Sequence, residues 1–335
     1  MKNKDTAFFI TLSILFVVVF FVSFAVGRYS VNVFTAIKIL FSKIFPIAQT
    51  WEASEEVVIL RIRLPRIIAA VFIGAALAVS GLVYQGLFQN PMVSPDILGA
   101  SSGAGFGAAL AILLKLNAFG ITISSFLGGL LAVAIVLLIA SRVKGIKLLS
   151  LVLSGIMISS LFNSLISLLK LTADTDNTLP QITYFLMGSL TSIKMSDLHF
   201  LLPIIILSFI PIVCIRWKLN VMTQGEEAAR SLGINTTAIK YITIISSTLM
   251  SASTVAIAGQ IGWVGLVIPH LVRMCVGCDY RKTIFASALM GGTFLLLVDT
   301  VARNMSAMEI PLGILTSFIG APFFLYLIVR EGRKS

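Results

Sequence analysis

Charged residues are scarce in this sequence. Only 12% of its 335 residues are charged, about half the share in a soluble domain, whereas 58% are hydrophobic and the mean hydropathy is +1.02. Segments 67–95, 116–141, 148–169, 241–272 and 310–329 contain no Asp, Glu, Lys or Arg. A helix crosses a bilayer with roughly 20 apolar residues, and isolated strands cannot satisfy their backbone groups in lipid. We therefore predict an all-α, polytopic membrane protein.

Cysteine and histidine are also rare. Three cysteines provide no disulfide framework, and the CVGC pair at Cys275 and Cys278 has no second pair, which favours a structural role. The two histidines, His199 and His270, are too isolated for a metal site. The sequence has no Walker A pattern, so any ATP that drives this protein must be hydrolysed by another subunit.

Acidic residues are fewer than basic ones, 14 against 25. A net charge of +11 can indicate nucleic acid, but here the basic residues lie in short loops between apolar runs, as the positive-inside rule expects. We therefore expect no nucleic-acid partner. Ten spans are expected, at 7–27, 64–86, 94–114, 118–141, 148–169, 199–216, 240–259, 263–276, 283–302 and 310–329.

An even number of spans puts both termini on one side of the membrane. Lys2 and Lys4 at the start, and Arg330, Arg333 and Lys334 at the end, indicate the cytoplasmic side of the cell membrane. The interval 241–272 is too long for one straight helix. Its glycines, followed by Pro269, predict two segments with a re-entrant turn between them.

A basic cluster conflicts with this orientation. Arg61, Arg63 and Arg66 fall at the outer side, at the end of an outer loop over 28–63. One interpretation is that they reach lipid phosphates or pair with nearby glutamates. The other is a docking site for an acidic partner, because the planar guanidinium binds a carboxylate through two hydrogen bonds. Pro65 is expected to start the helix that follows.

An ionisable pair inside a span is a second candidate. Asp299 and Arg303 lie four residues apart at the outer end of the ninth span. Such a pair either has a function or merely lowers the cost of inserting both charges. Glycines recur every four residues at Gly99, Gly103 and Gly107, a spacing that predicts close helix packing in lipid rather than a phosphate site.

The cytoplasmic loop over 217–240 contains a predicted short helix. Thr223 can cap it together with Glu226 as a capping box, and Gly233 can end it. Ala228, Ala229 and Leu232 would form a small apolar face. Such a helix is suited either to contact with another protein or to the membrane interface.

The chain resembles FecCD-type permeases, the membrane subunits of ABC importers for iron–siderophore complexes, haem and cobalamin. The resemblance is carried by RLPR (63–66), GAALAVSGLVYQGLFQNPMVSPDILGASSGA (74–104), GEEAARSLGIN (225–235), GWVGLVIPHLVR (262–273), DTVAR (299–303) and PLGILTSFIGAPFF (311–324). It implies one permease domain over 1–335 with the type II ABC importer fold. It also implies pairing with a second permease and two ATPase subunits.

The resemblance further implies roles for particular residues. Arg63, Arg66 and Arg303 match arginines that receive carboxylates of an extracytoplasmic substrate-binding protein. The helix of Glu226, Glu227, Ala228, Ala229, Arg230, Ser231, Leu232 and Gly233 resembles the coupling helix that fits the ATPase. Asn90, Pro91 and Met92 match a loop that narrows the cytoplasmic exit.

The expected function is that of a permease, not an enzyme, which moves an iron complex, most often a siderophore, across the membrane. No cofactor is expected on this chain. Haem, cobalamin or an oxyanion such as molybdate are alternative substrates of the same mechanism. A secondary transporter is another alternative, but such proteins usually carry ionisable groups at mid-membrane, and the spans here are almost free of charge.

Overall fold

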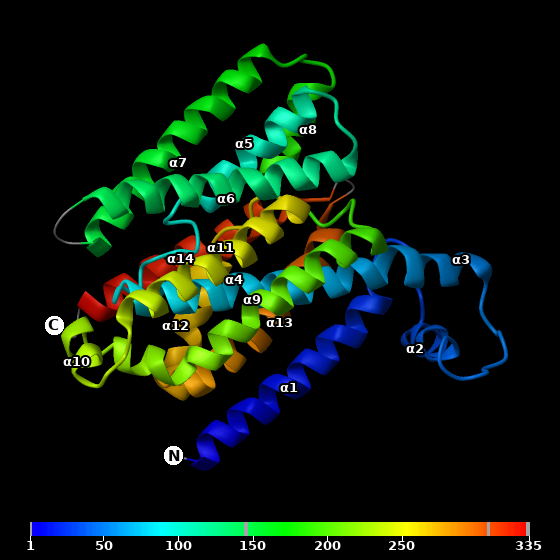
Figure 1. The fold of residues 1–335 in the computed structure, drawn as a ribbon. Coiled ribbons are helices and arrows are strands. Elements are labelled where there is room, and N and C mark those ends of the chain that lie inside the picture. The colour runs from blue at the N-terminus through cyan, green and yellow to red at the C-terminus, as the bar shows by residue number, and fades with distance from the viewer. Residues whose placement is uncertain (1, 144–146, 307–308, 333–335) are drawn as a thin grey trace.

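The structure is a computed structural model that describes residues 2–143, 147–306 and 309–332 (Figure 1). Arg333 and Lys334, named in the topology prediction, lie outside the described residues. The elements are α1 (Lys2–Ala25), α2 (Val33–Ser42), α3 (Ala53–Val57), η1 (Val58–Arg63), α4 (Leu64–Leu87), α5 (Ala100–Leu113), α6 (Ala118–Arg142), α7 (Lys147–Thr172), α8 (Thr178–Leu186), α9 (Met195–Met222), α10 (Glu226–Ser231), α11 (Thr236–Ala258), α12 (Val264–Val276), α13 (Tyr280–Met305) and α14 (Leu312–Gly332).

Helices account for every predicted span, and the described residues contain no strand. Among these residues, seven helices are long and apolar enough to cross a membrane: α1, the continuous helix Ala53–Leu87, α6, α7, α9, α11 and α13. The shorter helices α5, α12 and α14 correspond to the other three spans. The all-α fold class is therefore confirmed. The span predicted at 94–114 begins only at Ala100, because Gly99 adopts a left-handed conformation with φ of 80°.

The helix α4 lies at the centre of the bundle. It packs against α9, α11, α12 and α13, and most of its side chains are buried. Glycines allow the closest approaches, since a Cβ on Gly81 would overlap the carbonyl of Gly265 and a Cβ on Gly74 would overlap that of Gly291. By contrast, α1 is mostly exposed and packs chiefly on α13. The core therefore forms around α4, and small residues determine how near its neighbours lie.

The predicted glycine packing is confirmed for α5. A Cβ on Gly103 would overlap the carbonyl of Gly128, and one on Gly107 would overlap that of Ser124, both on α6. The hydroxyl of Ser124 donates to the carbonyl of Gly107 across the same contact, at 2.7 Å. The two helices therefore meet backbone to backbone.

The predicted break in 241–272 is also confirmed. The helix α11 ends at Ala258 and α12 starts at Val264, with Trp263 at φ 67° between them. The carbonyl of Ala258 accepts the N–H of Ser189 at 2.8 Å. Nearby in the chain from Ser189, the carbonyl of Gly188 accepts the N–H of Leu312 at 2.8 Å. The carbonyl at the start of this break thus has a protein partner, as irregular structure inside a membrane requires.

The segment 28–63, predicted as an outer connection between two spans, is partly helical. It contains α2, and the chain is helical without interruption from Ala53 to Leu87. Pro65 lies in the first turn of α4, as predicted, although the chain is already helical before it. The π-helical turn η1 precedes it, with the N–H of Leu64 bonded to the carbonyl of Ile59, five residues back. This wider turn accommodates a proline ring that would clash with a carbonyl in a regular helix.

Candidate functional site

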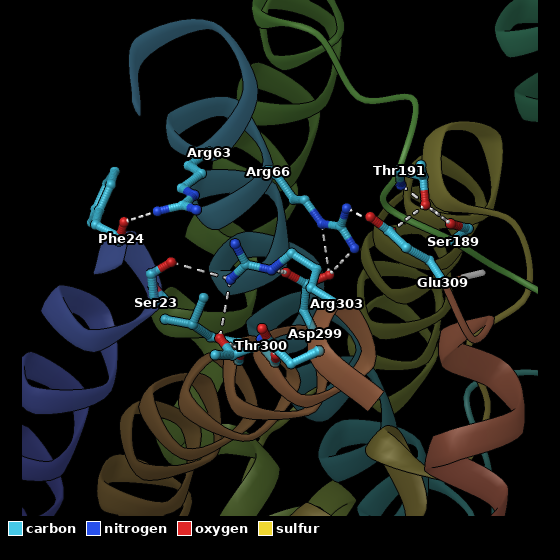
Figure 2. A network of polar contacts seen from close by, with 12 residues as sticks. Ser23, Phe24, Arg63, Arg66, Ser189, Thr191, Asp299, Thr300, Arg303 and Glu309 are labelled. Atoms are coloured by element: carbon cyan, nitrogen blue, oxygen red, sulfur yellow. Dashed lines mark hydrogen bonds and ion pairs between the residues drawn. The ribbon is translucent and has the colours of Figure 1, made fainter. Parts of the chain in front are cut away.

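The three arginines predicted to dock a partner lie together at one end of the bundle (Figure 2). Arg63 ends η1, Arg66 lies in the first turn of α4, and Arg303 lies in the last turn of α13. All three are buried, at 4%, 5% and 6% exposure. Buried guanidinium groups require partners inside the protein, because leaving such a charge unpaired is very costly.

Arg66 is held by two carboxylates. Its Nε donates to Asp299 Oδ1 at 2.9 Å and its Nη2 lies 2.8 Å from the same oxygen. Its Nη1 lies 2.8 Å from Glu309 Oε2, which also accepts the hydroxyl of Thr191 at 2.8 Å. Burial alone would raise the pKa of Glu309, but the neighbouring Arg66 holds that pKa below its usual value. Glu309 is therefore a charged partner of Arg66.

The other two arginines rely more on backbone oxygens. Arg63 donates to the carbonyl of Phe24, in the last turn of α1, and to that of Tyr29, in the segment that follows. Arg303 donates to the carbonyl of Ser23 at 3.2 Å, and its Nε lies 3.2 Å from Asp299 Oδ2. This last contact confirms the predicted i, i+4 ion pair, although it lacks hydrogen-bond geometry.

Five charged side chains lie together here, and we call them the outer arginine cluster: Arg63, Arg66, Asp299, Arg303 and Glu309 (Figure 2). Ion pairs connect four of them, whereas Arg63 bonds to backbone carbonyls. Three positive charges meet two negative ones, so the cluster retains an excess of one positive charge. The alternative interpretation, in which these arginines pair with the glutamates of 52–56, is not borne out among the described residues. Glu56 pairs with Lys43 instead, at 2.7 Å.

The burial of these arginines bears on the docking prediction. The exposed arginines of this region are Arg28 and Arg61, whereas Arg63, Arg66 and Arg303 point at internal acceptors. A partner's carboxylate could reach the buried guanidinium groups only by replacing one of these acceptors. Docking at Arg63, Arg66 and Arg303 therefore stays a prediction.

The predicted coupling helix exists as α10, at the opposite end of the bundle from α2 and α3 (Figure 1). Its C-terminus is as expected: Gly233 has φ 76°, its N–H bonds to Arg230, and the N–H of Ile234 bonds to Ala229, which is a Schellman motif. The predicted cap is wrong. Thr223 ends α9 and its hydroxyl bonds to Asn220, so Gly225 is the N-cap residue.

The side chain of Glu226 links α10 to α11 by hydrogen bonds and does not cap α10. Its carboxylate accepts Lys240 at 2.5 Å, Arg230 at 2.7 Å and Thr236 at 3.1 Å. The hydrogen bond from Lys240 is the main reason why the pKa of Glu226 is lowered. Ala229 is fully buried against the chain itself, so the predicted apolar face is divided. Arg230 is exposed beside its ion pair with Glu226, and the remaining exposed face consists of Glu227, Ala228, Ser231 and Leu232.

The predicted exit loop is the turn between α4 and α5. Asn90, Pro91 and Met92 are all exposed, and the Asn90 side chain accepts the N–H of Met92 at 2.9 Å. The preceding Gln89 donates to the carbonyl of Met222 at 3.2 Å. Met222 is the last residue of α9, just before α10. The turn is therefore linked by a hydrogen bond to the end of α9, which precedes the predicted coupling helix, a contact that the sequence did not indicate.

A polar stripe on α7 was missed by the sequence analysis. Ser160, Asn163, Ser164 and Ser167 are all exposed along a helix that is otherwise apolar enough to span the membrane. They line an open cavity of about 500 Å³ together with the 94–97 segment. Their spacing of i, i+3, i+4 and i+7 is the pattern of one helix face, and this pattern could have identified them. Exposed polar groups at this depth need water or a partner.

A second cavity, of about 710 Å³, lies on the other side of the 94–101 segment. It is lined by α14, by the break between α11 and α12, and by the end of α8. Both cavities are lined in part by Asp96. Cavities of roughly 300–1,000 Å³ accommodate ligands of small-molecule size.

Long apolar helices around a buried core, with cavities lined by polar groups, define a polytopic helical transport protein. Residues 15–330 match the model of the FecCD transport family. The molybdate import system permease protein MolB of Haemophilus influenzae is 40% identical over 96% of this chain and 95% of its own. An iron chelatin transport system permease protein of Helicobacter pylori is 40% identical over 83% of this chain and 84% of its own.

A solved structure agrees with these relatives. An inward-facing metal-chelate type ABC transporter is 38% identical, with a TM-score of 0.87 over 97% of this chain and 99% of its own. The chain belongs to the FecCD transport family. It is the permease subunit of an ABC importer, a multi-pass protein of the inner membrane, and separate subunits hydrolyse the ATP. Such a permease works with ATPase subunits, a binding protein and a second permease subunit.

Proposed function

We propose that this permease carries an iron chelate, with a siderophore complex as the leading candidate, across the inner membrane as an intact complex. The observation that carries this proposal is the exposed polar stripe of α7, which borders a cavity of about 500 Å³. A chelate with polar groups can pass along such a wall without losing all of its hydrogen-bonding partners. No described residue needs to form or break a covalent bond for this movement.

Molybdate is the second candidate. It is favoured by one observation, that the relative named for molybdate import aligns with 96% of this chain. The deciding experiment is uptake into proteoliposomes that contain the complete importer, with radioactive ⁵⁵Fe chelates and ⁹⁹Mo-molybdate offered separately. ATP-dependent accumulation of iron and not of molybdenum is the expected result. Uptake that continues without ATP and without ATPase subunits would instead indicate a secondary transporter.

The outer arginine cluster is the proposed docking site for the binding protein. Its excess positive charge suits an incoming carboxylate. Glu309 is the partner that such a carboxylate would replace. Its side chain is 19% exposed, against 0% for that of Asp299, and it lies just before α14. Docking would then exchange one carboxylate for another on Arg66.

This exchange predicts opposite effects for two substitutions, measured as the affinity of the binding protein for the complete importer in nanodiscs. Glu309→Gln removes the competitor and should tighten docking, whereas Arg66→Gln should weaken it by tenfold or more. Asp176→Asn, a change at an exposed residue of the segment between α7 and α8, serves as the control. Weaker docking by Glu309→Gln would contradict the exchange even if Arg66→Gln proves unstable.

The proposed contact with the ATPase is the exposed face of α10, formed by Glu227, Ala228, Ser231 and Leu232. Movement of α10 would pull on the end of α9, and from there on the exit turn through Gln89. The residues Asn90, Pro91 and Met92 are the proposed gate at this exit. ATP binding would thus change the width of the exit without direct contact between the ATPase and the gate.

Both termini are proposed to lie in the cytoplasm. The start of α1 and the end of α14 lie toward the same end of the bundle as α10 (Figure 1). A reporter that is active only in the cytoplasm, fused to either terminus, should therefore be active. An inactive reporter at both ends, with intact uptake, would reverse the topology.

A further inference from the structure

One carboxylate belongs to both cavities of this permease. Asp96 follows Pro95 in the segment between α4 and α5, is half-buried, and lines the cavity beside α7 as well as the cavity beside α14. Its Oδ1 accepts the hydroxyl of Ser101. No arginine or lysine among the described residues forms an ion pair with it, whereas Asp299 and Glu309 each have an arginine. Asp96 is therefore a carboxylate at the junction of two open spaces, without a cationic partner in the described chain.

Several of the remaining lining groups place hydrogen-bond acceptors beside this carboxylate. Asp96 is the single charged residue among those that line them, and no lysine, arginine or histidine of the described chain does so. The hydroxyls of Ser164, Ser167 and Ser317 donate to carbonyls four residues earlier, at 3.0, 3.0 and 2.6 Å. Their oxygens then face the cavities as hydrogen-bond acceptors only. The amide nitrogen of Gln260 donates to the carbonyl of Ser101 at 3.1 Å.

From this arrangement we infer that Asp96 acts as a charge filter in the transport route, which admits cationic or neutral cargo rich in hydrogen-bond donors and disfavours anions. The inference rests on the proposed function, because it takes the two cavities as parts of the route. It adds to the proposed function the charge class of the transported compound. Ferric complexes of neutral or positive charge fit such a wall, whereas oxyanions and carboxylate-rich chelates are repelled by the ionised Asp96 carboxylate. A charge in a cavity with low-dielectric walls acts over a longer distance than one in bulk water.

The local charge is measurable without any knowledge of the cargo. The native cysteines Cys214, Cys275 and Cys278 are free, so all three are replaced by serine first. A single reporter cysteine is then introduced as Asn163→Cys in one cavity or as Phe318→Cys in the other. The purified complete importer is treated with a cationic methanethiosulfonate, MTSET, or with the anionic MTSES, and the two reaction rates are compared.

The ratio of the cationic to the anionic rate should fall on the order of fivefold when Asp96→Asn is added, at both reporters. Asn keeps an oxygen that can accept the Ser101 hydroxyl, so the change removes charge with little change in shape. Asp176→Asn, an identical change at a residue that lines neither cavity, should leave both ratios unchanged. Equal ratios with and without Asp96→Asn, in a folded protein, would overturn the charge filter.

An uptake measurement tests the cargo class. Cells with the complete importer are offered ferric desferrioxamine B, which carries a positive charge, and ⁹⁹Mo-molybdate, which is an anion. We expect uptake of the iron complex and no uptake of molybdate. Efficient molybdate uptake by the unaltered protein would refute the cargo class. A protein that shows the labelling effect but imports no ferric complex would contradict the proposed function and leave the charge of the cavities established.

Discussion

Asp299 is the residue whose loss should destabilise this permease most specifically. It is fully buried in α13 and contacts two arginines of the outer arginine cluster, Arg66 on α4 and Arg303 on its own helix. Asp299→Asn preserves the shape of the side chain and removes its charge. The cluster would then hold three arginines and the single carboxylate of Glu309. Its excess positive charge would rise from one to two.

The size of the effect follows from the contacts. Arg66 approaches Asp299 Oδ1 with Nε at 2.9 Å and Nη2 at 2.8 Å, and Arg303 Nε lies 3.2 Å from Oδ2. Removal of one partner from a buried ion pair costs about 3–5 kcal/mol, because the remaining charge stays desolvated. Asparagine still offers one oxygen to Arg66, so we expect the lower part of this range, about 3 kcal/mol.

The measurement is the free energy of unfolding in mixed micelles, from titration with a denaturing detergent. Asp176→Asn, which alters an exposed carboxylate, should change it by less than about 0.5 kcal/mol. Adding Arg303→Gln to Asp299→Asn restores the charge balance, so the double variant should lose less than the sum of the two, by about 1–3 kcal/mol. If Asp299→Asn costs less than about 1 kcal/mol, the cluster does not hold α4 to α13 as described.

Three further predictions concern other parts of the molecule. Gly81→Ala places a Cβ against the carbonyl of Gly265 and should cost about 1–3 kcal/mol, seen as a lower Tm, and an unchanged Tm would disprove the close approach of α4 and α12. The pKa of Glu226 is lowered chiefly by Lys240, so this contact should stabilise α10 above pH 4.5 and be lost as the pH falls through the lower folded pKa. Hydrogen exchange of α10 measures this loss, and the same pH dependence in Lys240→Met would contradict its cause. Leu232→Asp, at a side chain that is 66% exposed, should leave Tm unchanged and reduce ATPase stimulation by the loaded binding protein tenfold or more, and normal stimulation would rule out this face of α10 as the ATPase contact.

Several features of the fold could be predicted from the sequence because their causes are local. Long stretches without charge indicate spans, and the structure has a helix at each predicted one. Glycines explain the break after Ala258 and the end of α10 at Gly233, because few other residues adopt such backbone angles. The α7 stripe was also local and could have been recognised by its spacing, at Ser160, Asn163, Ser164 and Ser167.

Two other local signals were modified by the segments that flank them in the chain. Thr223 is a residue type that favours N-caps, but α9 continues as far as Met222 and has Thr223 as its C-cap. Pro65 lies in the first turn of α4, as predicted, but the wide turn η1 continues the helix on its N-terminal side. In both cases a flanking segment with its own helical hydrogen bonds changed the helix boundary.

The sequence by itself determined that this is an all-α membrane protein of the FecCD family, and where most of its helices lie, because hydropathy and glycine act within a few residues. Only the tertiary structure decided what the arginines do. Arg66 and Asp299 are 233 residues apart, and whether a guanidinium faces solvent or a carboxylate depends on which helices meet. The same holds for Asp96, whose place between two cavities is set by α7 and α14 rather than by its neighbours in the chain.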